Sequence, residues 1–282
     1  MEEKSILLGK PRASRVKPTQ RSSLISFYLA NERPILGVSA VILFLVVWEA
    51  MGQSGRINPL FLSSPTKILS TAYKLFSSSR IYEDIKLSSE EFLLGYGLSI
   101  VIGIPLGILI GWYKRLNYLL EPFLSALYAT PRIALLPLVI MWFGIELNSK
   151  AVIIFLGAIF PIVINSLTGV RTVDLRLINV ARCFGATEWD IFNKVILQSC
   201  VPFILTGLRL GLAQALTGVV VAEFFAARGG VGFMITTAGA SFETNTVFVG
   251  ILIIAFAGVL FTEILRRVEK RFEKWRPAVG AS

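Results

Sequence analysis

The sequence predicts an all-α, polytopic integral membrane protein with about six transmembrane helices. Of its 282 residues, 54% are hydrophobic and only 16% are charged, and the mean hydropathy is +0.70. An average soluble domain has about 25% charged residues. The apolar residues are gathered in long runs, each close to the roughly 20 residues that a helix needs to cross a bilayer. Composition and spacing therefore agree on a helical membrane protein.

Composition also excludes several classes of function. The sequence contains no histidine and only two cysteines, Cys183 and Cys200. The absence of histidine excludes zinc sites that need it, Ser-His and Cys-His catalytic pairs, and most haem ligation. We expect no metal site, no cofactor and no catalytic residue. Both cysteines are expected to be small apolar fillers rather than a disulfide.

Residues 1–33 are predicted to form a basic cytoplasmic tail, because seven Lys and Arg lie there among Ser, Thr and Pro. Such a segment is expected to lie near anionic lipid. The first apolar run follows at 34–52, with Trp48 placed for an interfacial belt. Ser64 and Pro65 then predict the start of a surface helix outside the membrane, suited to packing or to contact with a partner protein.

The second predicted span, 92–112, carries small residues at four-residue intervals. They are Gly95, Ser99, Gly103, Gly107 and Gly111. In lipid, small residues at this spacing let another helix approach closely. The partner helix lies either within this chain or in a second copy of it.

The third apolar run, 119–144, is interrupted by Pro131 and Pro137, with Arg132 beside the first proline. A broken backbone at membrane depth is tolerated where it is buried or lines a cavity, so Pro131 and Arg132 are candidates for a translocation pathway. Equally, Arg132 could extend its side chain to the membrane interface.

The fourth, fifth and sixth spans are predicted at 151–167, 203–226 and 247–265, and they complete a membrane domain at 34–265. A Gly- and Thr-rich external loop is predicted at 227–246. The fifth span carries Arg209 and Glu223, which we add to the candidate pathway because charges inside spans are expensive and usually functional. It also carries a second stripe of small residues. These are Gly207, Gly211, Ala215, Gly218 and Ala222.

The placement of basic residues predicts the orientation. With both termini in the cytoplasm, the cytoplasmic segments, including a basic tail at 266–282, hold 19 Lys and Arg, and the external segments hold 7. This asymmetry follows the positive-inside rule. It accounts for the net charge of +10 without nucleic acid as a partner. It also places the polar segment 170–202 in the cytoplasm.

This cytoplasmic segment is predicted to form a helix, a glycine hinge and a second helix. The first helix begins near Asp174, and Gly185 then turns the chain at no steric cost. Thr187 and Asp190 have the spacing of a capping box. The second helix has one apolar stripe at three- and four-residue spacing. Its members are Trp189, Phe192, Val195 and Ile196.

The same segment resembles the EAA loop of permease subunits in ATP-binding-cassette (ABC) importers. Ala181, Gly185 and Leu197 match the family pattern, and the continuation 201–210, VPFILTGLRL, is close to the family form. Three positions depart from it, with Asn179 for Glu, Val180 for Ala and Gln198 for Pro. The resemblance extends over about 48–264 and is closest to the nitrate, sulfonate, taurine and bicarbonate group of permeases. It implies the fold of a type I importer permease.

The resemblance implies an importer permease of the bacterial inner membrane. Since the sequence has no G-x-x-x-x-G-K-[ST] loop to bind phosphates, ATP must be hydrolysed by a partner. The assembly that the resemblance implies contains two ATPase subunits, a second permease copy and an external substrate-binding protein. The solute is expected to be a small anion. The coupling residues carried over from the family are Ala181, Gly185, Ala186, Thr187, Glu188 and Trp189. An ion-gradient-driven transporter or a channel is the alternative.

Overall fold

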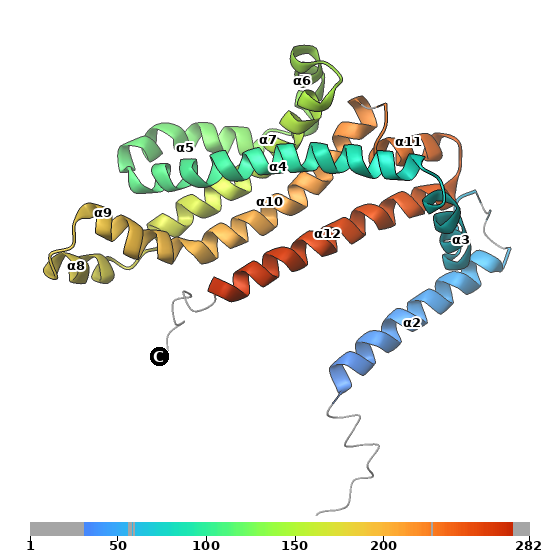
Figure 1. Ribbon diagram of the computed structural model, residues 1–282, viewed down its shortest axis with the longest axis horizontal. Coiled ribbons are helices and arrows are strands. Elements are labelled where there is room, and N and C mark those ends of the chain that lie inside the picture. Colours follow the sequence, from blue (N-terminus) through green and yellow to red (C-terminus); the bar gives the residue numbers. More distant parts are fainter. Residues whose placement is uncertain (1–30, 56–57, 59, 227, 273–282) are drawn as a thin grey trace, which may run out of the picture. The chain divides into compact units, whose positions relative to one another are not determined.

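The computed structural model describes residues 31–55, 58, 60–226 and 228–272. The regular structure of these residues is entirely helical (Figure 1). Five helices are long and apolar enough to cross a membrane, and a pair of helices bent by 91° makes a sixth candidate. The predicted all-α fold with about six spans is confirmed.

The chain divides into two parts near Ala50, which are described separately. The first part contains most of α2 (Glu32–Gln53), which corresponds to the first predicted span. The Phe44 and Trp48 rings lie 5.8 Å apart on this helix. Residues 1–30 and 273–282, which make up most of the two predicted basic tails, lie outside the described residues.

The second part is organised around α7 (Leu147–Arg171), which packs along both α4 (Arg80–Trp112) and α10 (Leu197–Ala226). At one end of this bundle lie α8 and α9, and α3 and α11 lie at the opposite end (Figure 1). α4 begins well before the predicted start of its span at residue 92. The added turns are stable because their polar residues face inward and find partners, which the description of the site gives below.

The two stripes of small residues both face α7. A Cβ atom added to Gly95 would lie 2.7 Å from the Ala151 carbonyl oxygen, and one added to Gly107 would lie 2.5 Å from the Val163 carbonyl oxygen. In the second stripe, on α10, a Cβ added to Gly211 would lie 3.1 Å from the Ala158 carbonyl oxygen of α7. The sequence left open where the partner of the first stripe lies. The structure shows that it is α7 of the same chain.

The third span is bent where the prolines predicted a break. α5 (Lys114–Ala129) ends at Thr130, and η1 (Arg132–Leu135) and α6 (Leu136–Phe143) leave at 91° to it. Pro131 has no N–H to continue the helix, and it holds Thr130 in an extended conformation. Pro137 lies in the first turn of α6, where proline is tolerated, and causes no second break.

The remaining helices include one correction. α3 (Pro65–Phe76) is the predicted surface helix, with Pro65 in its first turn. The external loop predicted at 227–246 instead contains α11 (Val231–Ala240), so the prediction of a loop was wrong over these residues. α12 (Thr244–Phe272) also extends beyond the predicted span end at 265, because Glu263 forms ion pairs with Arg266 and Arg267 along its last turns.

The contact between α4 and α7 can be tested with a matched pair of glycines on α4. Gly107→Ala places a methyl group 2.6 Å from Ser166 Cβ, whereas Gly97→Ala places one where nothing lies within 4 Å. Overpacking of this kind costs about 1–3 kcal/mol. We expect Gly107→Ala to lower the apparent Tm of the detergent-purified protein by several degrees and Gly97→Ala to leave it unchanged. Equal effects of the two substitutions would contradict the packing described here.

Candidate functional site

The turn between α8 (Leu175–Cys183) and α9 (Glu188–Ile191) is built as a rigid unit. Asp174 caps α8 by accepting a hydrogen bond from the Arg176 N–H at 2.8 Å. At the other end of α8, Gly185 has φ +76°, a conformation that favours glycine. There the Ala186 N–H donates to the Ala181 carbonyl at 3.0 Å, and the Gly185 N–H donates to the Arg182 carbonyl at 2.9 Å. This pair of bonds is a Schellman motif, so the predicted hinge is a defined C-cap.

α9 begins with the predicted capping box. Thr187 Oγ1 accepts from the Asp190 N–H, and the Asp190 carboxylate accepts from the Thr187 N–H, each at 3.2 Å. The helix then continues without interruption through a π-helical segment, η2 (Phe192–Ile196), into α10. The second predicted helix is therefore the first part of the fifth span's own helix.

The buried side of α9 and η2 packs against the ends of α4 and α7. Ile191 and Ile196 are almost fully buried, in a cluster with Ile108 of α4 and Val170 of α7. The predicted stripe contained Ile196 but missed Ile191, because the two are separated by a five-residue π turn rather than by three or four residues. Trp189, the first member of the predicted stripe, does not join this cluster and is 71% exposed.

The tip of the turn is apolar and exposed. Phe184 is 88% exposed, and Trp189 stacks on Phe192 with ring centroids 5.8 Å apart. An exposed ion pair between Arg182 and Glu188, at 2.9 Å, spans the turn. The six residues predicted for coupling all lie here: Ala181, Gly185, Ala186, Thr187, Glu188 and Trp189. The turn thus presents large apolar side chains on a backbone fixed at both caps, as a docking surface requires.

A cavity of about 360 Å³ lies at the bend of the third span, between this bend, α7 and α10. Pro131 and Arg132 line it, as do Gly157 and Gln214. Arg132 Nη1 donates to Gln214 Oε1 at 2.9 Å and to the Gly157 carbonyl at 3.3 Å. Gly157 and Gln214 lie in the middle parts of their helices, so this guanidinium lies at mid-length of the bundle rather than at its end, and Arg132 is partly buried.

The other two candidate pathway residues lie elsewhere. Arg209 forms an ion pair with Glu269 of α12. Glu223 is fully buried and is not among the described residues that line the Arg132 cavity. The structure therefore brings together two of the four residues, and a pathway role of Arg209 and Glu223 stays a prediction.

Glu223 instead belongs to a buried polar cluster that fixes the N-terminus of α11. Its carboxylate accepts from Ser88 Oγ and from the Gly232 N–H, each at 2.5 Å. Ser88 Oγ in turn accepts from the Val231 N–H at 2.9 Å, and Asp84 accepts from the Gly230 N–H at 2.8 Å. Three successive N–H groups are thus satisfied by side chains of α4 and α10. These groups would otherwise be orphans at a helix start.

A buried ion pair between Lys150 and Glu91 lies at the same end of the bundle, with 2.6 Å between Nζ and Oε1. Sequence reasoning missed this pair and the polar side chains of the α11 cluster on α4. A signal was present, because Asp84, Ser88 and Glu91 lead at three- and four-residue spacing to Gly95. They therefore continue the face of α4 that the stripe of small residues had marked as buried.

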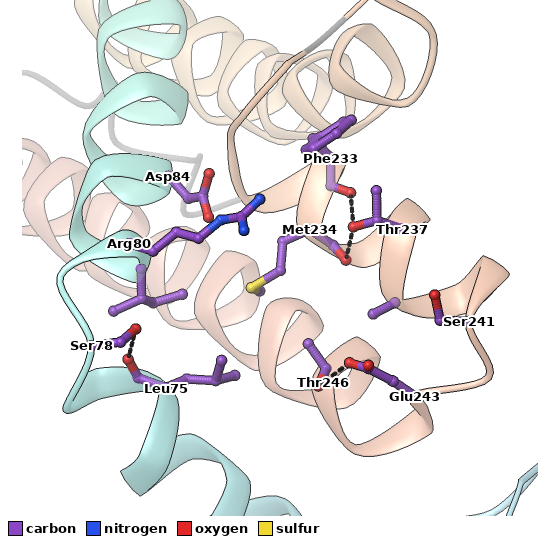
Figure 2. A pocket seen from close by; sticks show the side chains of 12 residues that line it. Leu75, Ser78, Arg80, Asp84, Phe233, Met234, Thr237, Ser241, Glu243 and Thr246 are labelled. Carbon is purple, nitrogen blue, oxygen red and sulfur yellow. Dashed lines mark hydrogen bonds between the residues drawn. The ribbon is translucent and has the colours of Figure 1, made fainter.

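A second cavity, of about 380 Å³, opens at the α11 end. Figure 2 shows Arg80 and Asp84 of α4 on one wall and Phe233, Met234 and Thr237 of α11 on another. Glu243 also lines it, so charges of both signs are present. In contrast, Arg132 is the one charged residue among the described residues that line the first cavity.

Comparison with known families decides the class of the protein. Residues 103–274 match the family described as binding-protein-dependent transport system inner membrane component. The chain belongs to this family. It is an ABC importer permease subunit, and the resemblance found at the EAA-like segment is confirmed.

Curated relatives of this permease cover most of its length. It is 38% identical over 232 residues to the putative aliphatic sulfonates transport permease protein SsuC of Bacillus subtilis, covering 82% of this chain and 84% of the relative. It is 32% identical over 249 residues to the taurine transport system permease protein TauC of Escherichia coli, covering 86% and 90%.

Among solved structures, the permease is similar to a chain of the inward-facing MetNI methionine ABC transporter, with a TM-score of 0.59 and 18% identity. The match covers 68% of this chain and 95% of that chain. At this identity the similarity shows the fold alone. It agrees with the predicted fold of an importer permease.

The buried Lys150–Glu91 pair gives a test of the polar cluster. Lys150→Met leaves the Glu91 carboxylate buried without its cation, which costs about 3–5 kcal/mol in buried pairs. The control is Lys86→Met on α4, since the Lys86–Glu90 pair is exposed at 3.8 Å and such pairs contribute about 0–1 kcal/mol. We expect a clear loss of thermal stability of the purified permease only for Lys150→Met. Recovery in the double variant Lys150→Met/Glu91→Leu would identify the unpaired carboxylate as the cause.

Proposed function

We propose that this permease is the membrane-spanning subunit of an ATP-driven importer and that it receives energy through the turn between α8 and α9. Its sequence contains no phosphate-binding loop that would let it hydrolyse ATP. The observation that carries the proposal is the exposed tip formed by Phe184 and Trp189 on a turn with a Schellman motif and a capping box. We assign the contact with the ATPase to Ala181 and to residues 185–189.

Movement of this turn would be transmitted to the membrane helices by direct packing. Ile191 and Ile196 are held between α4 and α7, and η2 continues directly into α10. Because glycines bring α4, α7 and α10 into close contact, these helices would move as one body. Alternating access would then be a rigid-body rotation of this core, a common form of conformational switch.

The proposed assembly contains two copies of an ATP-binding subunit, a second permease copy and an external substrate-binding protein. The family description, binding-protein-dependent transport system inner membrane component, supports the binding protein and the bacterial inner membrane. The excess of Lys and Arg in the segments assigned to the cytoplasm supports both termini inside and the turn on the side of ATP.

The proposed solute is a small anion. Two relatives at 38% and 32% identity are named for aliphatic sulfonates and taurine, and both names describe compounds with a sulfonate group. We place Pro131 and Arg132 on the pathway, because a cavity at the bend, lined also by α7 and α10, contains a cation.

The coupling assignment predicts the effect of changing the exposed tip. Trp189 is 71% exposed, and its one ring contact among the described aromatic pairs is the stack on Phe192, so Trp189→Ala should fold normally. We expect it to retain at most about a tenth of the co-purifying ATPase subunit, because exposed Trp anchors contribute about 2 kcal/mol or more to interfaces. The measurement is the amount of ATPase subunit that co-purifies with the tagged permease when the two are expressed together.

The matched control is Tyr73→Ala, which removes a 79% exposed aromatic ring from α3 at the other end of the bundle. It should leave the yield of ATPase unchanged. If Trp189→Ala also retains the full amount of ATPase, the coupling surface lies elsewhere. If the wild-type permease never retains an ATPase and moves solute on an ion gradient alone, the importer proposal fails.

A further inference from the structure

The cavity at the bend of the third span contains an unneutralised positive charge. The ammonium of Lys150 and the guanidinium of Arg209 each face a carboxylate, Glu91 and Glu269 respectively. Arg132 has no such partner within the described residues, since both of its hydrogen-bond acceptors are neutral: the Gln214 side-chain amide and the Gly157 carbonyl. A cation in a membrane span is costly, and such residues usually pair with another charge or a backbone carbonyl, or face a cavity on a substrate pathway.

The guanidinium is also oriented, with part of it unused. In the described part of the chain, only Nη1 of Arg132 has hydrogen-bond partners. Gln214 and Gly157 hold this nitrogen from α10 and α7, and Nη2 and Nε keep donor capacity. A guanidinium that is fixed through one nitrogen presents a planar fork, the geometry that binds carboxylate and other oxyanions in a bidentate manner.

The walls of the cavity match a small organic ion. Ile133, Ile153 and Val221 supply aliphatic surface, and Thr130 and Thr217 also line the cavity. The hydroxyl groups of both threonines donate to backbone carbonyls of their own helices, so Arg132 is left as the donor for an anion. A volume of about 360 Å³ accommodates an oxyanion group with a short carbon chain. Gly157 allows α10 and the guanidinium to lie close to α7, because a Cβ there would lie 3.4 Å from Arg132 Nη1 and 3.2 Å from the Gln214 carbonyl oxygen.

We propose that Arg132 binds the oxyanion group of the transported solute, a small organic monoanion, and that Gln214 is the positioning residue that orients its guanidinium. This proposal deepens the proposed function and rests on it for the direction and energy of transport. The site itself is defined by charge and geometry. It can therefore be tested without ATP or a binding protein.

The test measures the electrostatic potential inside the cavity. In a Cys183→Ser/Cys200→Ala background, Thr217→Cys places a single thiol on the cavity wall. The purified permease is reacted with sulfonatoethyl methanethiosulfonate, which is anionic, and with trimethylammonioethyl methanethiosulfonate, which is cationic. Relative to the rates of the two reagents with a free thiol in solution, we expect the cavity to favour the anionic reagent, and we expect millimolar ethanesulfonate to slow its reaction.

Two variants remove the charge in different ways. Arg132→Gln deletes the cation, and Gln214→Glu places a carboxylate at the 2.9 Å contact with Arg132 and neutralises it at nearly constant volume. Each should lower the ratio of the anionic to the cationic reaction rate by at least about tenfold. A tenfold change corresponds to about 1.4 kcal/mol of electrostatic energy between the unit charge of Arg132 and a charged reagent in the cavity. An apparent Tm and a gel-filtration profile like those of the parent Thr217→Cys protein show that the fall in the ratio comes from the lost charge and not from damage to the fold.

The control is Arg115→Gln, which removes an exposed cation near the start of α5, outside the cavity lining, and should not change the ratio. An unchanged ratio in Arg132→Gln, absence of protection by ethanesulfonate, or no reaction at Thr217→Cys would each overturn the proposal. ATP-dependent uptake by the complete assembly is measured separately. Failure of uptake with a normal labelling ratio would reject the proposed function and leave the anion site intact.

Discussion

The close approach of α4 and α10 to α7 is the constraint on which the second part of the chain depends. In lipid, helices gain little from hydrophobic association, so their contact must come from tight packing and from hydrogen bonds. Glycines provide the packing, because a Cβ at Gly107 or Gly211 would meet the backbone of α7. Ser99 adds a hydrogen bond from α4 to the Phe155 carbonyl at 3.2 Å. α7 is consequently the most buried span, and it serves as the common reference for both functional regions.

The turn between α8 and α9 and the Arg132 cavity depend on this core in opposite ways, the first by contact with it and the second by separation from it. The turn between α8 and α9 lies at the end of the packed helices, and its buried isoleucines join it to them. Its exposed tip is therefore mechanically continuous with the core. The third span has no stripe of small residues facing α7 along its length, and it bends by 91° at Pro131. The bend leaves space that the packed core does not fill, and this space is the Arg132 cavity.

The sequence predicted the features that depend on local chemistry. Gly185, the Thr187–Asp190 box and the break at Pro131 are each set by one or two residues, and all three are found as expected. Features that depend on distant partners were missed. The helix at 231–240 is stabilised by Glu223, Ser88 and Asp84, which lie far from it in sequence. Likewise, no spacing rule could show that Gln214 meets Arg132 across 82 positions of the chain.

The charges at the α11 end and the charge of Arg132 indicate different roles. At the α11 end, both oxygens of Glu223 are occupied by protein donors, and Lys150 is paired with Glu91. Glu223, Glu91 and Lys150 line neither of the two cavities described above, and the bonds of Glu223 fix α11 to α4 and α10. Arg132 is partly buried and faces a cavity with part of its donor capacity unused. A charge that only stabilised the fold would be placed like Glu223, so the arrangement of Arg132 favours a ligand that arrives and leaves.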